Sequence, residues 1–175
     1  MDRETDARVI QPEDARSFWQ PVPANGFVRC ILDDTVVRAD TPFAMGMQTV
    51  DPGCHVREHE HPVQEEIIHF VAGSGTIRLD GVEHSARPGT TVFIGKGRRH
   101  GFINTGDGPM TFVWVLMPGG LERFFAAIGR PRREGEPAPA PFPRPANVAE
   151  IERSTLFGWA DQSLMRPGGA GPADG

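Results

Sequence analysis

Three histidines and one glutamate are the side chains in this sequence best suited to metal chemistry. His59, His61 and Glu66 stand close together, and His100 follows 34 residues after Glu66. Successive side chains of a strand point to opposite faces, so His59 and His61, two residues apart, lie on the same face. Their imidazoles can therefore share one ion. Glu66 opens an apolar run, so an antiparallel neighbour could present its carboxylate to both imidazoles. The spacing therefore predicts a site for a transition metal, without choosing which one.

Glycine-framed motifs surround these ligands and resemble the two sequence motifs of the cupin superfamily. The pattern G-x5-H-x-H-x4-E-x6-G is filled at every position, and the pattern G-x5-P-x-G-x2-H-x3-N departs at one. Gly95 stands where the family usually has a proline, so a less rigid turn is expected there. The matching residues are Gly53, His59, His61, Glu66 and Gly73 in the first motif, and Gly89, Gly97, His100 and Asn104 in the second.

This resemblance covers about residues 28–118 and implies both a fold and a cofactor. The chain is similar to small single-barrel cupins of the cupin_2, quercetinase-like type. The implied fold is all-β: a single-domain double-stranded β-helix, or jelly-roll barrel, with an N-terminal arm and one or two short C-terminal helices. The implied cofactor is one divalent transition metal per chain, with iron favoured over Mn, Ni, Zn, Co or Cu, bound by His59, His61, Glu66 and His100.

Short runs with turn signals between them agree with a barrel. Each run is alternating or apolar, and Gly, Pro, Asp and Asn separate them. No helical pattern interrupts the series, which excludes alternating α/β architectures. The runs cover residues 28–33, 43–50, 54–61, 66–71, 76–80, 82–85, 91–94, 99–104 and 110–116.

Two segments flank the expected barrel directly. Residues 1–27 form a polar arm with a few apolar side chains, which suggests that it crosses the barrel or a neighbouring molecule. Residues 119–130 show the spacing of an amphipathic helix. Its apolar face consists of Leu121, Phe124, Phe125 and Ile128.

Three further segments complete the chain. Residues 131–146 are rich in proline and predict an extended strap. Asn147 followed by Glu150 resembles a capping box, which predicts a short helix over residues 147–158. Residues 159–175 turn rich in glycine and proline and are expected to be disordered.

Strand parity extends the candidate site beyond its ligands. Side chains at even spacing from a ligand should face the cavity, and Arg57 there could bind an anionic or enolate oxygen or lie at a solvated rim. Arg98 and Arg99 could likewise bind an anionic oxygen or lie at a solvated rim. Phe93 is expected either in the cavity lining or in the ordinary core. The predicted substrate-binding residues are Arg57, Gln64, Phe102, Asn104, Phe112 and Trp114.

The remaining histidines are expected to lie outside the ligand group. His69 has the opposite parity to Glu66 and should face away from the site. His84 follows an Asp-Gly hairpin signal and should be exposed. His55 shares parity with His59 but lies four residues earlier, which places it near the barrel rim.

Composition limits the class of protein. A chain of 175 residues with 38% hydrophobic content fits one globular domain. A net charge of −5 with scattered basic residues predicts no nucleic-acid partner. Without a signal-peptide pattern or a long apolar span, we expect a cytoplasmic protein with no membrane partner. Cys30 and Cys54 lack a metal-binding spacing and should be free buried thiols.

A symmetric homodimer is also expected, because apolar side chains remain outside the predicted barrel core. They lie in the arm, at Phe18 and Trp19, and on an outward strand face with Ile67, His69 and Val71. Small monomers rarely expose that much apolar surface.

The ligand set predicts an open, working metal site. Four protein ligands on an octahedral ion leave two positions for water, dioxygen or a chelating small-molecule substrate. Glu66 would act also as catalytic base. The chain has no tyrosine, which excludes mechanisms based on a tyrosine base. The resemblance favours a dioxygenase acting on an oxygenated aromatic or dicarbonyl; the alternatives are an oxygen-independent isomerase or cyclase, and a non-catalytic binding protein.

Overall fold

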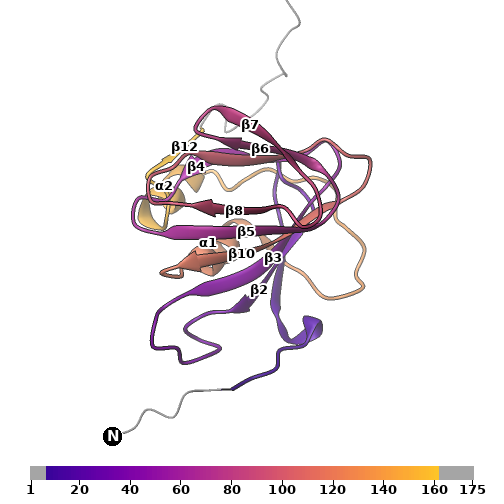
Figure 1. Cartoon of the computed structure of the whole chain (residues 1–175). Helices are drawn as coiled ribbons and strands as arrows, with labels where there is room; N and C mark the ends of the chain where they lie inside the picture. The colour runs from indigo at the N-terminus through magenta and orange to yellow at the C-terminus, as the bar shows by residue number, and fades with distance from the viewer. Residues whose placement is uncertain (1–6, 162–175) are drawn as a thin grey trace, which may run out of the picture.

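A computed structural model describes residues 7–161 and shows two antiparallel β-sheets that face each other as a barrel (Figure 1). The larger sheet has the strand order β11-β1-β2-β3-β10-β5-β8, and the smaller has the order β12-β4-β9-β6-β7. The expected all-β, single-domain fold is therefore confirmed. The strands are β1 Arg16–Trp19, β2 Phe27–Leu32, β3 Ala44–Val50, β4 His55–Glu60, β5 Glu65–Ala72, β6 Gly75–Leu79, β7 Val82–Ala86, β8 Thr91–Ile94, β9 His100–Asn104, β10 Met110–Met117, β11 Arg130–Pro131 and β12 Trp159–Ala160; the helices are a 3-10 turn Pro12–Asp14, α1 Leu121–Ile128 and α2 Val148–Ser154.

The core lies between the sheets because alternate residues of the central strands point inward. Along β10 every second residue is buried, and its register pairs Trp114 with Ile68 and Phe112 with Phe70 on β5. Large aromatic and aliphatic side chains thus fill the barrel interior, where their burial is the main favourable term in folding.

Nine strands, β2 to β10, lie on the nine predicted runs, and no strand end differs from its prediction by more than one residue. Within the predicted arm, residues 16–19 form β1, which joins the larger sheet and pairs with β2. Within this strand Phe18 and Trp19 pack on their own chain, and the Trp19 indole donates to Glu136 Oε1 at 2.6 Å. These two aromatic side chains are packed within one chain, so no neighbouring molecule is needed to cover them.

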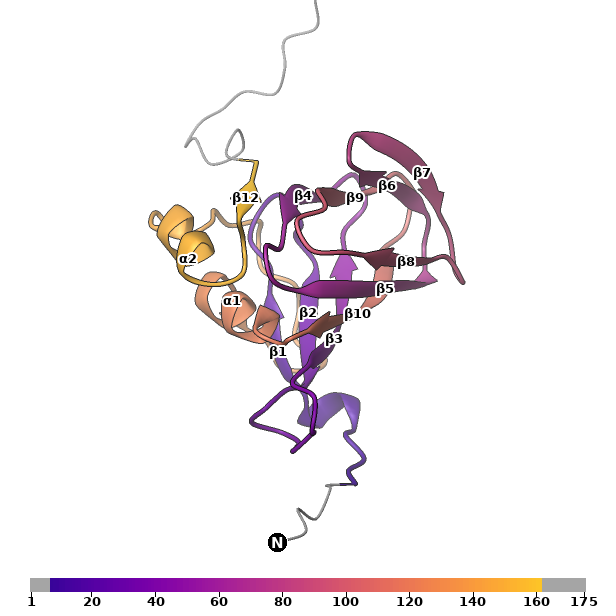
Figure 2. The ribbon, with the colours of Figure 1, turned by 60° about the vertical axis from the view of Figure 1, so that its left-hand side comes forward.

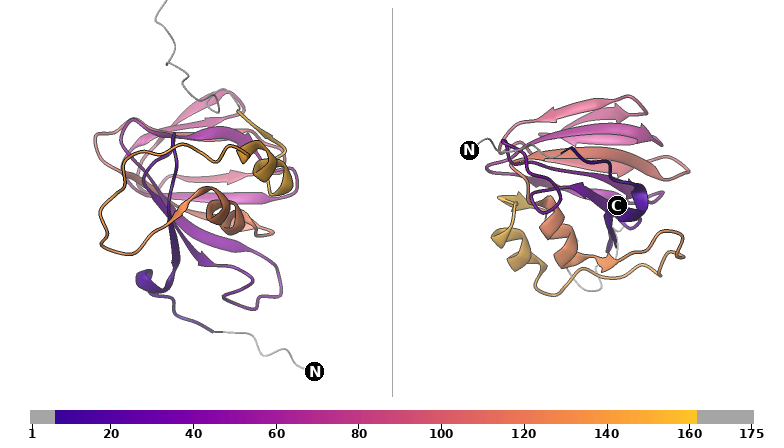
Figure 3. Two further views of the ribbon diagram at one scale, coloured as in Figure 1. Left: turned by 180° about the vertical axis from the view of Figure 1, so that it is seen from behind. Right: turned by 90° about the horizontal axis from the view of Figure 1, so that it is seen from below.

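Both helices and the irregular segment after α1 cover the same side of the sheets (Figures 2 and 3). The apolar face of α1 is buried with the barrel core. Asn147 stands at the N-cap of α2 but makes no side-chain capping hydrogen bond, so the expected capping box does not form. Residues 132–147 hold no helix or strand, and in Figure 3 they run from β11 to α2.

The chain after α2 returns to the barrel. Trp159 and Ala160 form β12, which pairs with Glu60 and His59 of β4. Disorder was expected from residue 159 onward, and that expectation is wrong at residues 159–161; residues 162–175 lie outside the described part. Neither described helix has the length and apolar character needed to cross a membrane.

Candidate metal centre

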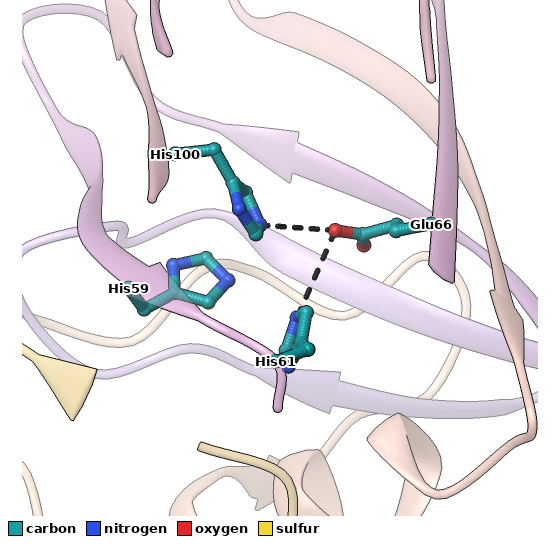
Figure 4. A group of neighbouring side chains, drawn as sticks. All are labelled: His59, His61, Glu66 and His100. Carbon is teal, nitrogen blue, oxygen red and sulfur yellow. Dashed lines mark ion pairs between the residues drawn. The ribbon is translucent and has the colours of Figure 1, made fainter. Parts of the chain in front are cut away.

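The four expected ligands meet at one point between the two sheets (Figure 4). His59 lies on β4 opposite His100 of β9, and His61 follows the end of β4. Glu66 reaches them from β5 of the other sheet. All four side chains are buried, and one donor atom from each lies within 4.8 Å of the others. The group is able to hold a metal ion.

Glu66 faces two of the imidazoles directly. Its Oε2 lies 3.0 Å from His100 Nε2 and 3.7 Å from His61 Nε2. The ring centroids of His59 and His100 are 4.1 Å apart, and those of His59 and His61 are 4.9 Å apart. Apart from their contacts with one another, Nε2 of His61, Nε2 of His100 and Oε2 of Glu66 are buried atoms with no hydrogen-bond partner among the described residues. Such convergent donors without partners fit a cation at their centre.

Backbone carbonyls fix the orientation of all three imidazoles. The Nδ1 atoms of His59, His61 and His100 lie 2.8, 3.2 and 2.9 Å from the carbonyl oxygens of Arg57, Leu156 and Arg98. A carbonyl only accepts, so each Nδ1 carries the proton and each neutral ring keeps its Nε2 lone pair for a metal. The residues present therefore fit a divalent ion.

Burial also favours the neutral, metal-binding form of two rings. Burial, reinforced by the neighbouring His100 and His61, holds the pKa of His59 well below its usual value. The pKa of His61 is lowered as well, mainly by burial, although Glu66 opposes the change. Burial pulls the pKa of His100 down too, but the Glu66 carboxylate outweighs it and the net shift is upward.

Residues 155–161 cover the ligand group from the helix side. Besides the Leu156 carbonyl on His61, the Phe157 ring centroid lies 5.1 Å from that of His59 and 5.2 Å from that of His61. The pairing of β12 with β4 then fixes the chain beside His59. No local sequence pattern predicts this cover, because its contacts depend on where the irregular segment returns to the barrel.

An apolar cavity of about 70 Å³ opens beside the ligands, with His59 and Glu66 in its wall. Three of the predicted substrate-binding residues line it, namely Arg57, Phe102 and Phe112. Residues outside the barrel strands complete the wall, and the sequence did not single them out as site residues: Leu121, Phe124, Phe125, Ile128, Arg144 and Phe157.

Other predicted contacts lie away from this cavity. Asn104 uses its amide to donate to the carbonyls of Val50 and Gly108, so it holds a turn. Trp114 lies across Gly46, where an added Cβ would come 2.2 Å from the indole, and it belongs to the sheet core. Gln64 is buried but is not part of the cavity wall.

One aromatic residue lies on the outer surface and not in the lining or the core. Phe93 was expected in the lining or the core, yet it is 62% exposed and pairs with Ile67 on the outer face. The run of four residues in β8 is too short to show which face is buried. His69 and His84 are exposed, as expected from their positions.

The remaining polar residues singled out in the sequence differ in exposure and in their contacts. Arg98 and Arg99 are exposed and form ion pairs with Asp80 and Glu60. His55 lines the far end of the cavity. Of the two free cysteines, Cys30 is buried, where burial raises its pKa to about 12, and Cys54 is half-buried.

Comparisons with known proteins agree with this geometry. The family model described as the cupin domain matches residues 46–116. Protein SchB of Streptomyces halstedii is 38% identical over 119 residues, which cover 66% of this chain and 80% of that protein. A chain from Klebsiella pneumoniae, described as an uncharacterized conserved protein with a double-stranded β-helix domain, superposes with a TM-score of 0.52 at 19% identity, covering 65% of this chain and 92% of its own.

Two further relatives bear names from polyketide synthesis. Polyketide synthase CurC of Streptomyces cyaneus is 32% identical over 116 residues, covering 66% of this chain and 70% of its own length. Tetracenomycin polyketide synthase protein TcmJ of Streptomyces glaucescens is 30% identical over 93 residues, covering 53% of this chain and 62% of its own. This chain belongs to the cupin superfamily.

Proposed function

We propose that this cupin is a metal-dependent cyclase that acts on a poly-β-carbonyl substrate. The observation that carries the proposal is that Glu66 and His59 belong both to the ligand group and to the wall of the apolar cavity. A 1,3-dicarbonyl bound through its two oxygens would therefore place its central carbon beside the Glu66 carboxylate. The names of CurC and TcmJ support this substrate class, because a polyketide chain alternates carbonyl and methylene groups.

Glu66 is the proposed base. A divalent ion bound by the four ligands would polarise the carbonyl oxygens and acidify the methylene between them. The Glu66 carboxylate takes that proton, and the carbon bonds to a second carbonyl carbon farther along the same chain. This bond closes the ring, and the oxygen of that carbonyl receives the proton. The new hydroxyl then leaves as water with a hydrogen from the neighbouring carbon, which forms a double bond. The balance needs no oxidant, so a redox-inactive ion such as zinc would serve as well as iron.

Aromatic walls supply the second requirement, which is a dry and compact site. Phe102, Phe112, Phe124 and Phe157 surround the cavity. At about 70 Å³ it is smaller than the roughly 300–1,000 Å³ of ligand pockets in general. A substrate would therefore enter by displacing residues 155–161, and their return would exclude water from the reacting carbons.

A dioxygenase is the second candidate function. Four protein ligands leave two positions on an octahedral ion, enough for a chelating substrate or for dioxygen beside a singly bound one. A dioxygenase would use the same base and the same class of substrate as the cyclase. It would differ from the cyclase in requiring oxygen and a redox-active ion.

Oxygen dependence separates these functions. Zinc-loaded and iron-loaded protein would be offered a linear 2,4,6,8-tetraketone, in which the proposed bond closes a six-membered ring. Substrate loss, dissolved oxygen and product mass would be followed together. A cyclase yields a product lighter by one water at equal rates in air and under nitrogen, and Glu66→Gln slows it by about 10²-fold or more. Turnover that stops under nitrogen supports the dioxygenase, and binding without turnover in either atmosphere supports a binding protein.

A further inference from the structure

Two arginines and one glutamate form a buried cluster at the cavity. Arg57 comes from β4, Arg144 from the irregular segment before α2, and Glu152 from α2. Arg57 Nη2 donates to Glu152 Oε1, and Arg144 Nη1 lies 2.9 Å from the same oxygen. Arg57 also donates to the backbone carbonyl of Asp161. Both arginines line the cavity, whereas Glu152 does not.

Charge is not balanced within this cluster. Two guanidinium groups share one buried carboxylate, and the side chain of Arg144 is only 10% exposed. Its buried Nη1 atom has as its ion-pair partner Glu152 Oε1, the oxygen that Arg57 also uses. The partly exposed Asp161 also attracts Arg57, whereas among the described residues Glu152 is the anion that attracts Arg144. A buried cation that is incompletely paired is costly unless another group compensates it.

Arg144 remains a cation at neutral pH despite this environment. Burial, helped by repulsion from Arg57, lowers its pKa to about 10. The cavity wall thus carries two cationic groups from arginine and, from Glu66, one carboxylate that belongs to the ligand group. The arginine end is therefore suited to an anionic group.

We propose that Arg144 and Arg57 form a carboxylate subsite, so that the substrate is a poly-β-carbonyl acid whose free carboxylate binds Arg144 while its diketone lies at His59 and Glu66. Planar guanidinium groups match carboxylates in shape and donor geometry. Glu152 occupies the position of a competing carboxylate and satisfies the arginines when substrate is absent. The inference rests on the proposed function, because it takes this cavity as the substrate site.

Succinylacetone provides the probe, because it carries a 1,3-diketone and a carboxylate on one short chain. Its methyl ester keeps the diketone and loses the charge. Calorimetric binding to zinc-loaded protein should favour the acid by about tenfold or more, the range for a hydrogen bond to a charged group. Arg144→Gln should abolish this preference while leaving the affinity for the ester unchanged.

Glu152→Gln is the complementary variant, because it removes the competing charge and keeps the shape. It should strengthen acid binding and not ester binding. Arg144→Lys retains the charge and should retain part of the preference, which keeps a result available if Arg144→Gln does not fold. Arg87→Gln, an exposed arginine before β8, is the matched control and should change neither affinity.

Equal binding of acid and ester to the unaltered protein, or no binding of either, overturns the carboxylate subsite. So does an Arg144→Gln variant that weakens both probes equally, since that indicates a structural role. The readout is binding, so it is independent of turnover. If the protein prefers the acid but cyclises no substrate, the carboxylate subsite stands and the cyclase function is refuted. If the protein cyclises its substrate but does not prefer the acid, the cyclase function stands and the subsite is refuted.

Discussion

His61 donates from Nδ1 to the backbone carbonyl of Leu156 across 3.2 Å, which joins a metal ligand of the barrel to the segment that follows α2. The adjacent Phe157 ring packs against His59, His61 and, at 4.6 Å between centroids, Phe124 of α1. Orientation of a ligand and closure of the cavity therefore depend on the same short stretch of chain.

Shortening Phe157 should loosen this cover without removing a ligand. In Phe157→Ala the Leu156 carbonyl remains, so we expect metal to be retained, with stability lowered by roughly 1–3 kcal/mol for the lost packing. Release of metal to a chelator should be faster by about tenfold. This factor corresponds to ~1.4 kcal/mol less free energy holding residues 155–161 over the site. Val82→Ala, at an exposed apolar residue of β7, is the control. Equal release rates in the two variants would show that Phe157 does not cover the site.

Removing ligands should remove the metal. Purified without chelator, the protein should hold roughly one divalent transition ion per chain. The pair His59→Ala and His100→Ala should bring this close to zero in elemental analysis and lower the melting temperature, because an ion that binds the folded state stabilises it by about 2.7 kcal/mol at a hundred times its Kd. His84→Ala changes an exposed histidine of β7 and should have neither effect. Unchanged metal content in the double variant would refute the four-ligand assignment.

Local patterns predicted the barrel because its strands alternate with period two and its ligands recur at fixed spacing within them. The cluster of Arg57, Arg144 and Glu152 was not predictable in this way. Arg57 and Glu152 are 95 residues apart in the sequence. They meet only because the irregular segment before α2 brings the chain back to the barrel. Likewise, β12 has two residues and gains its structure from pairing with β4, so its own sequence shows no alternation.

Gly95, which replaces the proline usual in cupins, allows a test of turn rigidity. Its φ lies outside the left-handed region and an added Cβ would meet only Arg98, at 3.9 Å. Gly95→Ala should therefore raise the free energy of unfolding by about 0.4–1 kcal/mol by restricting the unfolded chain. Gly97 in the same turn has φ +68°, so Gly97→Ala should lower it by roughly 1 kcal/mol. Urea titration measures both, and a destabilised Gly95→Ala would show that this turn needs the freedom of glycine.

The expected homodimer is best placed on the outer face of β5 and β8. Phe93 is 62% exposed opposite Ile67, and Val71 and His69 lie farther along the same face, whereas Phe18 and Trp19 of the arm pack on their own chain.

We propose that two copies pair through this face, because it exposes neighbouring apolar side chains on an edge strand. Light scattering should give twice 19.1 kDa for the unaltered chain and 19.1 kDa for Phe93→Asp, since a carboxylate buried in the interface would be unpaired. Val82→Asp places the same charge on exposed β7 and should leave the dimer intact. A single-chain mass for the unaltered protein at micromolar concentration would contradict the dimer, and a dimeric Phe93→Asp would place the interface elsewhere.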